Sequence, residues 1–183
     1  MIKHVLVSMT SALLLSALLP ACGAGGAGEG EGEEGEGDDA DLDVPPQGEA
    51  ALDAWIATDR YQQWACEDAP HAPRAPSPHP ENRICSNPLL AGVGDGDPIP
   101  LGAASVKELF DGSGNLVGHA VSIKVAAGGA GDPAAMYWYE KVDGEAAADG
   151  LGDRGGVPQT VCFDCHSHGP DAGGTEQFFT IVR

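Results

Sequence analysis

Two cysteines and a histidine near the end of the chain are the residues best suited to chemistry. Cys162 and Cys165 stand three apart, and His166 follows directly in the stretch CFDCH. The pattern C-x-x-C-H is the attachment motif of c-type haem. Each thiol can add to one vinyl group of the porphyrin, and the adjacent imidazole can then ligate the iron. The motif therefore predicts covalent haem c, anchored by both cysteines, with His166 as the metal ligand.

Two other chemistries use cysteines at this spacing. A zinc site is disfavoured because Cys165 and His166 are neighbours and no second C-x-x-C is present. A thioredoxin-like dithiol belongs to a βαβ unit, which the sequence does not indicate. Haem attachment is the favoured interpretation, with a redox dithiol and a metal site as the alternatives. His168 is expected to be solvated or to lie beside the site.

The first residues have the pattern of an export signal. A basic Lys3 precedes an apolar run over 5–19, which is too short for a membrane span. The run ends in LPAC, which resembles a bacterial lipobox. We therefore expect residues 1–21 to be a lipoprotein signal peptide, with Cys22 acylated and the chain held on the periplasmic side of a membrane. This compartment agrees with haem c, which is attached outside the cytoplasm. The alternative is ordinary cleavage nearby, which would leave Cys22 as a free thiol.

Residues 22–49 are rich in glycine and in carboxylates. Glycine gives this stretch no preferred backbone, and the like charges repel one another. We expect a flexible tether, with an acidic docking arm as the alternative. The whole chain has a formal net charge of −19, so that phosphate groups would be repelled and nucleic acid is excluded as a partner.

Cys66 and Cys85 remain once the lipobox and the C-x-x-C-H motif are assigned. In an exported protein the default for such a pair is a disulfide. The bond would close a loop of about twenty residues and contribute about 3 kcal/mol by the chain-entropy estimate. We therefore predict a structural Cys66–Cys85 disulfide.

The elements that must position these residues lie within 50–183. Apolar residues at helical offsets predict one helix within 49–67, and five prolines predict a loop over 68–83. Strands are predicted over 103–111, 116–127, 135–142 and 176–182, joined by short Gly- and Asp-containing segments. The fold class is therefore α+β and β-rich, with an antiparallel sheet, an N-terminal helix and a short C-terminal helix at the cysteine motif. Alternation along 103–111 places Lys107 on the face opposite Val106.

The stretches GAASVKELFD, AVSIKV, MYWYEK, CFDCH and EQFFTIV follow one another in this order. Together they resemble the cytochrome P-460 and cytochrome c′-beta family over about residues 50–183. The resemblance implies an antiparallel β-sheet domain, a homodimer in many members, and a five-coordinate haem with an open distal side. It also implies that Lys107 can be joined covalently to the porphyrin edge, and that Arg83 is the pocket arginine.

Three functions agree with these residues. The first is oxidation of hydroxylamine or a related nitrogen species, with electrons passed to a redox partner protein. This reaction needs a proton-accepting carboxylate, and the segment just before the motif contains no acid. The second is capture of nitric oxide at an open iron without catalysis. The third is plain electron transfer with Met136 as a second axial ligand, although its aromatic strand indicates a core position. Whether the protein is an enzyme is therefore left open.

Overall fold

The computed structural model describes residues 44–74, 77–129, 131–152, 156–167, 178 and 180–183, without the side chain of residue 159. The expected signal peptide, Cys22, most of the expected tether and His168 lie outside the described residues. Glu49 begins the first helix, so the end of the stretch expected to be a tether belongs to the folded part. None of the described helices combines the length and the apolar character that crossing a membrane requires.

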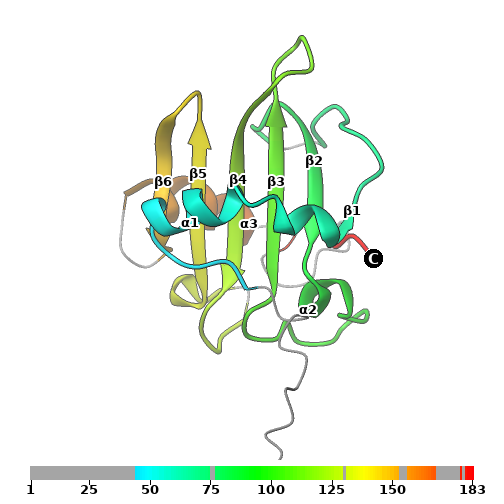
Figure 1. The fold of residues 1–183 in the computed structure, drawn as a ribbon. Coiled ribbons are helices and arrows are strands. Elements are labelled where there is room, and N and C mark those ends of the chain that lie inside the picture. Colours follow the sequence, from blue (N-terminus) through cyan, green and yellow to red (C-terminus); the bar gives the residue numbers. More distant parts are fainter. Residues whose placement is uncertain (1–43, 75–76, 130, 153–155, 168–177, 179) are drawn as a thin grey trace, which may run out of the picture. The chain divides into compact units, whose positions relative to one another are not determined.

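One antiparallel sheet forms the centre of the described chain (Figure 1). Its six strands are hydrogen-bonded in the order in which they follow along the sequence. Asp143 and Gly144 form the tight turn between the last two strands, and both have positive φ, at 51° and 84°. Such a two-residue loop matches the twist of an antiparallel hairpin. The strands are β1 (Ala65–Cys66), β2 (Glu81–Ser86), β3 (Ala104–Phe110), β4 (Leu116–Lys124), β5 (Met136–Val142) and β6 (Glu145–Leu151).

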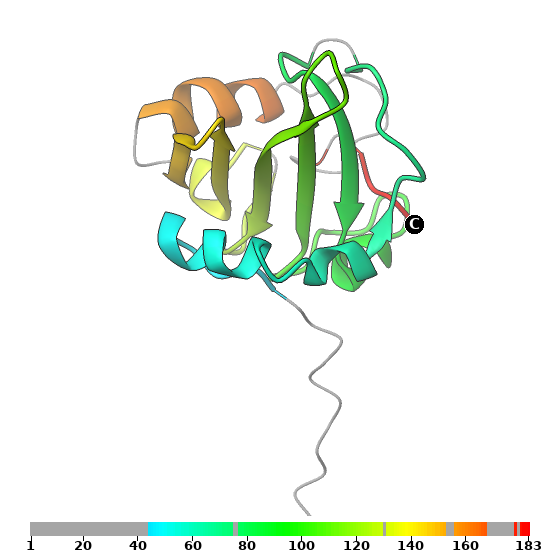
Figure 2. The same cartoon turned by 45° about the horizontal axis from the view of Figure 1, so that its top comes forward.

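Two short helices cover one face of the sheet (Figures 1 and 2). Helix α1 (Glu49–Ile56) is followed by the 3-10 helix η2 (Arg60–Gln63). The sequence predicted one helix within 49–67, but the chain turns at Asp59, whose φ is 57°. A side chain in this left-handed conformation interrupts a right-handed helix. The core on this face consists of Leu52, Ile56, Tyr61, Cys85, Ala104, Val106, Val121, Ile123, Tyr137 and Tyr139.

Helical turns near the C-terminus lie on the opposite face of the sheet from α1 (Figure 2). They comprise a π-helical stretch, η4 (Pro158–Phe163), and a final turn of α-helix, α3 (Asp164–Ser167). At one end of the sheet, α2 (Pro88–Ala91) and the 3-10 turn η3 (Pro133–Ala135) complete the described elements. A second buried cluster forms here from Leu90, Val93, Ile99, Ala103, Met136, Trp138 and Phe178.

The α+β, β-rich and antiparallel fold class is confirmed, and three of the expected strands correspond to β3, β4 and β5. The sequence missed β1, β2 and β6. Strand β2 begins at Glu81, inside the expected loop over 68–83. Pro80 is the last proline of this loop, so the residues that follow it can pair with β3. The alanines of β6 are weak strand formers, and the hairpin turn brings them to β5. The prediction of a strand over 176–182 is wrong for residues 180–182, which are irregular. Residues 176, 177 and 179 lie outside the described residues.

The predicted disulfide is confirmed. Cys66 of β1 and Cys85 of β2 are directly paired across the two strands and are covalently linked. The bond closes a loop with a sequence separation of 19 and fixes the short edge strand β1 to the sheet. The Pro-rich loop between these cysteines is thereby held beside the face of the sheet that carries Lys107.

Candidate functional site

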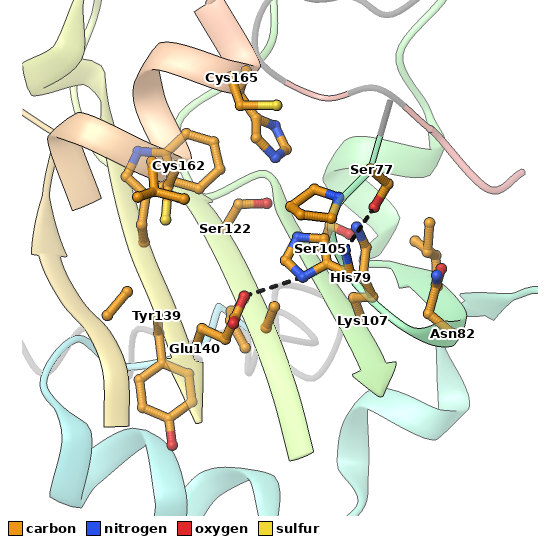
Figure 3. A pocket seen from close by; sticks show the side chains of 18 of the residues that line it. Ser77, His79, Asn82, Ser105, Lys107, Ser122, Tyr139, Glu140, Cys162 and Cys165 are labelled. Atoms are coloured by element: carbon orange, nitrogen blue, oxygen red, sulfur yellow. Dashed lines mark hydrogen bonds and ion pairs between the residues drawn. The ribbon is translucent and has the colours of Figure 1, made fainter. Parts of the chain in front are cut away.

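A cavity of about 310 Å³ lies between the sheet, the C-terminal helical turns and the Pro-rich loop (Figure 3). This volume is at the lower end of the range typical of small-molecule and cofactor sites. Strands β2 to β6 form one wall, the loop residues Ser77–Pro80 form a second, and residues of η4 and α3 form the third. The cavity is on the face of the sheet opposite α1.

The strand register determines which side chains reach the cavity. Directly paired residues of neighbouring strands point to the same face of a sheet. Ile84, Lys107, Ala120, Glu140 and Ala148 are paired in succession across β2 to β6, and all five line the cavity. The next row contributes Ser105, Ser122 and Trp138. Four of these residues are small (Ser105, Ala120, Ser122 and Ala148), which leaves room above the sheet.

The complete C-x-x-C-H motif lines this cavity. Cys162 lies in the π-helical stretch, Cys165 and His166 belong to α3, and all three line the cavity. Both cysteines are free thiols and half-buried. Burial raises the pKa of the Cys162 thiol to about 11, and the nearby Glu140 carboxylate acts in the same direction. Two uncommitted thiols and an imidazole therefore face the same space.

Trp138 supports the histidine of the motif. Its indole ring lies 4.5 Å from the imidazole of His166, centroid to centroid, at an interplanar angle of 56°. Trp138 is only 4 % exposed, and its indole N–H has no hydrogen-bond partner within the described part of the chain. Met136, two residues earlier on the same strand, packs in the second buried cluster and does not line the cavity.

Lys107 points into the cavity, on the face opposite Val106 as the strand alternation predicts. Burial lowers the pKa of its ammonium to about 8, although the Glu140 carboxylate opposes this shift. The side chain makes no hydrogen bond or ion pair with any residue that the structure describes. At mildly alkaline pH, a buried amine with a lowered pKa is uncharged more often than the amine of an ordinary lysine. It is therefore the better nucleophile.

The structure does not bring Arg83 to this cavity. Arg83 pairs with Glu108 across β2 and β3, on the face covered by α1 and η2. Its Nη1 lies 3.2 Å from Glu108 Oε2, and Tyr61 donates a hydrogen bond to Oε1 of the same buried carboxylate. Arg83 is one residue out of phase with Ile84, which does face the cavity, so strand alternation turns the guanidinium away. The arginine that lines the cavity is Arg74 of the Pro-rich loop, held by Glu67 at 2.5 Å.

Two cavity residues were missed from the sequence. Glu140 of β5 and His79 of the Pro-rich loop both line the cavity, and Nδ1 of the imidazole lies 3.1 Å from Oε2 of the carboxylate (Figure 3). Alternation within the stretch MYWYEK could have indicated Glu140, because it shares a face with Trp138 while Tyr139 faces α1. No pattern in the Pro-rich loop points to His79.

The cavity residues fit a covalently attached haem. Two free thiols and the adjacent imidazole face a cavity whose sheet wall is mostly small and apolar or weakly polar. Within the described residues, no three side chains of His, Cys, Asp or Glu are grouped so as to hold a metal ion directly.

No family model matches this sequence, and neither the curated proteins nor the solved structures contain a significant match.

Proposed function

We propose that this chain is a c-type haem protein that acts on small nitrogen species at an open iron site. The observation that carries the proposal is the position of the C-x-x-C-H motif. Cys162, Cys165 and His166 all line a cavity, and both thiols are free. The similarity of residues 50–183 to the cytochrome P-460 and cytochrome c′-beta family supports the same cofactor.

The chain's own residues have separate tasks in this proposal. The helical turns over 158–167 carry Cys162 and Cys165, which would form the thioethers, and His166, which would ligate the iron. The indole of Trp138 packs against the imidazole of His166 and limits its rotation. When bound, the haem supplies an iron that can coordinate a small neutral molecule and exchange single electrons.

Electron transfer with a Met136 ligand is the least supported of the three functions, because Met136 is 1 % exposed and packs away from the cavity. Oxidation of hydroxylamine releases one proton for each electron removed, and therefore needs a proton acceptor. The Glu140–His79 pair supplies such groups within the cavity. This pair favours oxidation, with electrons passing to a redox partner protein, over binding alone.

Nitric oxide binding is the second candidate function, because it requires only an open iron and no proton acceptor. A covalent bond between Lys107 and the porphyrin edge belongs to the enzyme proposal. It would replace one N–H bond of the amine and one C–H bond of the porphyrin, with two electrons passing to an external oxidant and two protons to solvent. The position and lowered pKa of Lys107 support that bond, since the free amine is the form that reacts.

The proposed location is the periplasmic side of a bacterial membrane, with lipid on Cys22 and residues 23–43 as the connecting segment. The net charge of −19 favours a redox partner with a basic surface. The family resemblance further suggests a homodimer.

Hydroxylamine oxidation and nitric oxide binding can be separated with haem-loaded protein and an artificial one-electron acceptor. Glu140→Gln combined with His79→Asn removes both candidate proton acceptors; it should reduce the rate of hydroxylamine oxidation at least about a hundredfold, the usual contribution of acid–base catalysis, and should leave nitric oxide binding intact. Glu145→Gln is the matched control, because Glu145 is exposed on β6 and does not line the cavity. Nitric oxide binding by a wild-type protein that does not oxidise hydroxylamine would favour the binding function instead.

A further inference from the structure

The pairing of Glu140 with His79 allows the two groups to be assigned different tasks, an assignment that rests on the proposed hydroxylamine oxidation. The contact joins Oε2 of Glu140 to Nδ1 of His79 at 3.1 Å. At this distance an ionised carboxylate oxygen would repel the lone pair of an unprotonated Nδ1, so the contact favours the proton on Nδ1. In a neutral imidazole the other nitrogen, Nε2, then has a free lone pair.

The free nitrogen of His79 is available within the cavity. Its Nε2 makes no hydrogen bond with any residue that the structure describes. The imidazole lines the cavity, and its side chain is 17 % exposed, which leaves a way for protons to reach solvent. A carboxylate beside Nδ1 favours the Nδ1–H tautomer of an imidazole, whose Nε2 can then act as a base.

The Pro-rich loop holds His79 in place. Pro78 and Pro80 flank the histidine and restrict the backbone on both sides. The backbone N–H of His79 also donates a hydrogen bond to Oγ of Ser77 at 3.3 Å. The ionisable residues that line the cavity with the pair are Arg74, Lys107, Tyr139, Cys162, Cys165 and His166.

We propose that Nε2 of His79 is the proton acceptor for the molecule bound in the cavity, and that Glu140 is a positioning residue. For each electron that passes from hydroxylamine to an external one-electron acceptor, one N–H or O–H bond of hydroxylamine breaks. Its proton moves to Nε2 and gives the imidazolium. The imidazolium then releases a proton to solvent and returns to the neutral Nδ1–H form, still held by Glu140.

His79→Asn separates the two assignments, because an asparagine amide can donate near the position of Nδ1 but cannot accept a proton. With haem-loaded protein and an artificial acceptor, this variant should lower kcat for hydroxylamine at least about a hundredfold and leave KM and nitric oxide binding little changed. His119→Asn is the matched control and should retain most of the rate, because His119 contacts Tyr61 on the other face of the sheet and does not line the cavity. A His79→Asn variant with the wild-type kcat would overturn the proposal and make Glu140 the base.

The tautomer of His79 tests the pair without any turnover. Nitrogen-15 NMR of the wild-type protein, at a pH where the imidazole is neutral, should show the proton on Nδ1. Glu140→Leu should move the proton to Nε2 or give a mixture of the two tautomers. A wild-type ring protonated on Nε2 would refute the assignment of base and positioning residue. If hydroxylamine is not oxidised at all, the proposed function fails, whereas the NMR result still decides whether Glu140 orients His79.

Discussion

Replacement of Lys107 by methionine should stabilise the haem-free fold at neutral pH. Burial lowers the pKa of the Lys107 ammonium from 10.5 to about 8. In the unfolded chain the pKa of Lys107 keeps its ordinary value. The difference between the folded and unfolded pKa values corresponds to about 3 kcal/mol of destabilisation at any pH where the ammonium is protonated in both the folded and the unfolded chain. Methionine has a similar length and no charge, so Lys107→Met should raise the free energy of unfolding by about 3 kcal/mol at pH 7.

The effect should depend on pH in a defined direction. Below pH 8 both folded and unfolded chains bind the proton, and the full penalty is present. As the pH rises from about 8 towards 10.5, the folded chain loses the proton first and the penalty decreases. At pH 10 the advantage of methionine should fall below about 1 kcal/mol.

Urea denaturation, followed by circular dichroism, measures both values. Cys162→Ser with Cys165→Ser provides a background without covalent haem. Lys141→Met is the matched control: Lys141 is held by Glu49 and Asp53 at 2.9 and 2.7 Å, and its loss should give no gain. A Lys107→Met protein that is no more stable at pH 7, or whose advantage is the same at pH 10, would refute the argument from burial.

Three further predictions concern Cys85, Lys107 and Cys22. Cys85→Ser should lower the free energy of unfolding of the oxidised protein by about 3 kcal/mol, as expected for a disulfide with a sequence separation of 19. Under reducing conditions the variant and the wild-type protein should have nearly the same free energy of unfolding. Lys107→Ala should leave haem attached and, if the porphyrin bond exists, should return the red-shifted ferrous Soret band towards that of an ordinary c-type haem; an unchanged spectrum would show that Lys107 is not bonded to the haem. Mass spectrometry of the mature protein should find a diacylglyceryl adduct on Cys22, and an unmodified Cys22 would rule out the lipid anchor.

The sequence could predict those features that follow from local patterns. Alternation placed Lys107 on the face opposite Val106, and the expectation of export led to a predicted Cys66–Cys85 disulfide; both features are seen in the structure. The family resemblance, in contrast, suggested Arg83 as the pocket arginine. A shift of one residue along β2 reverses the face of the side chain, and only the strand register decides between the two faces.

Features that depend on long-range pairing could not be predicted. Strand β6 has an alanine-rich sequence that forms a strand because the turn at Asp143 and Gly144 places it beside β5. The contact between His79 and Glu140 joins a loop to a strand far along the chain, and nothing in the local sequence of either segment specifies it. Strand alternation could have indicated Glu140, but its contact with His79 follows only from the tertiary structure.

Covalent haem on Cys162 and Cys165 is the claim on which the proposed function depends most directly. The test is expression of the full chain in a bacterial host with c-type haem maturation, followed by mass spectrometry of the peptide that contains both cysteines. We expect one haem bound to this peptide through both sulfur atoms, and its loss in the Cys162→Ala, Cys165→Ala variant. Wild-type protein from the same host that carries no haem and in which both thiols can be alkylated would contradict the account.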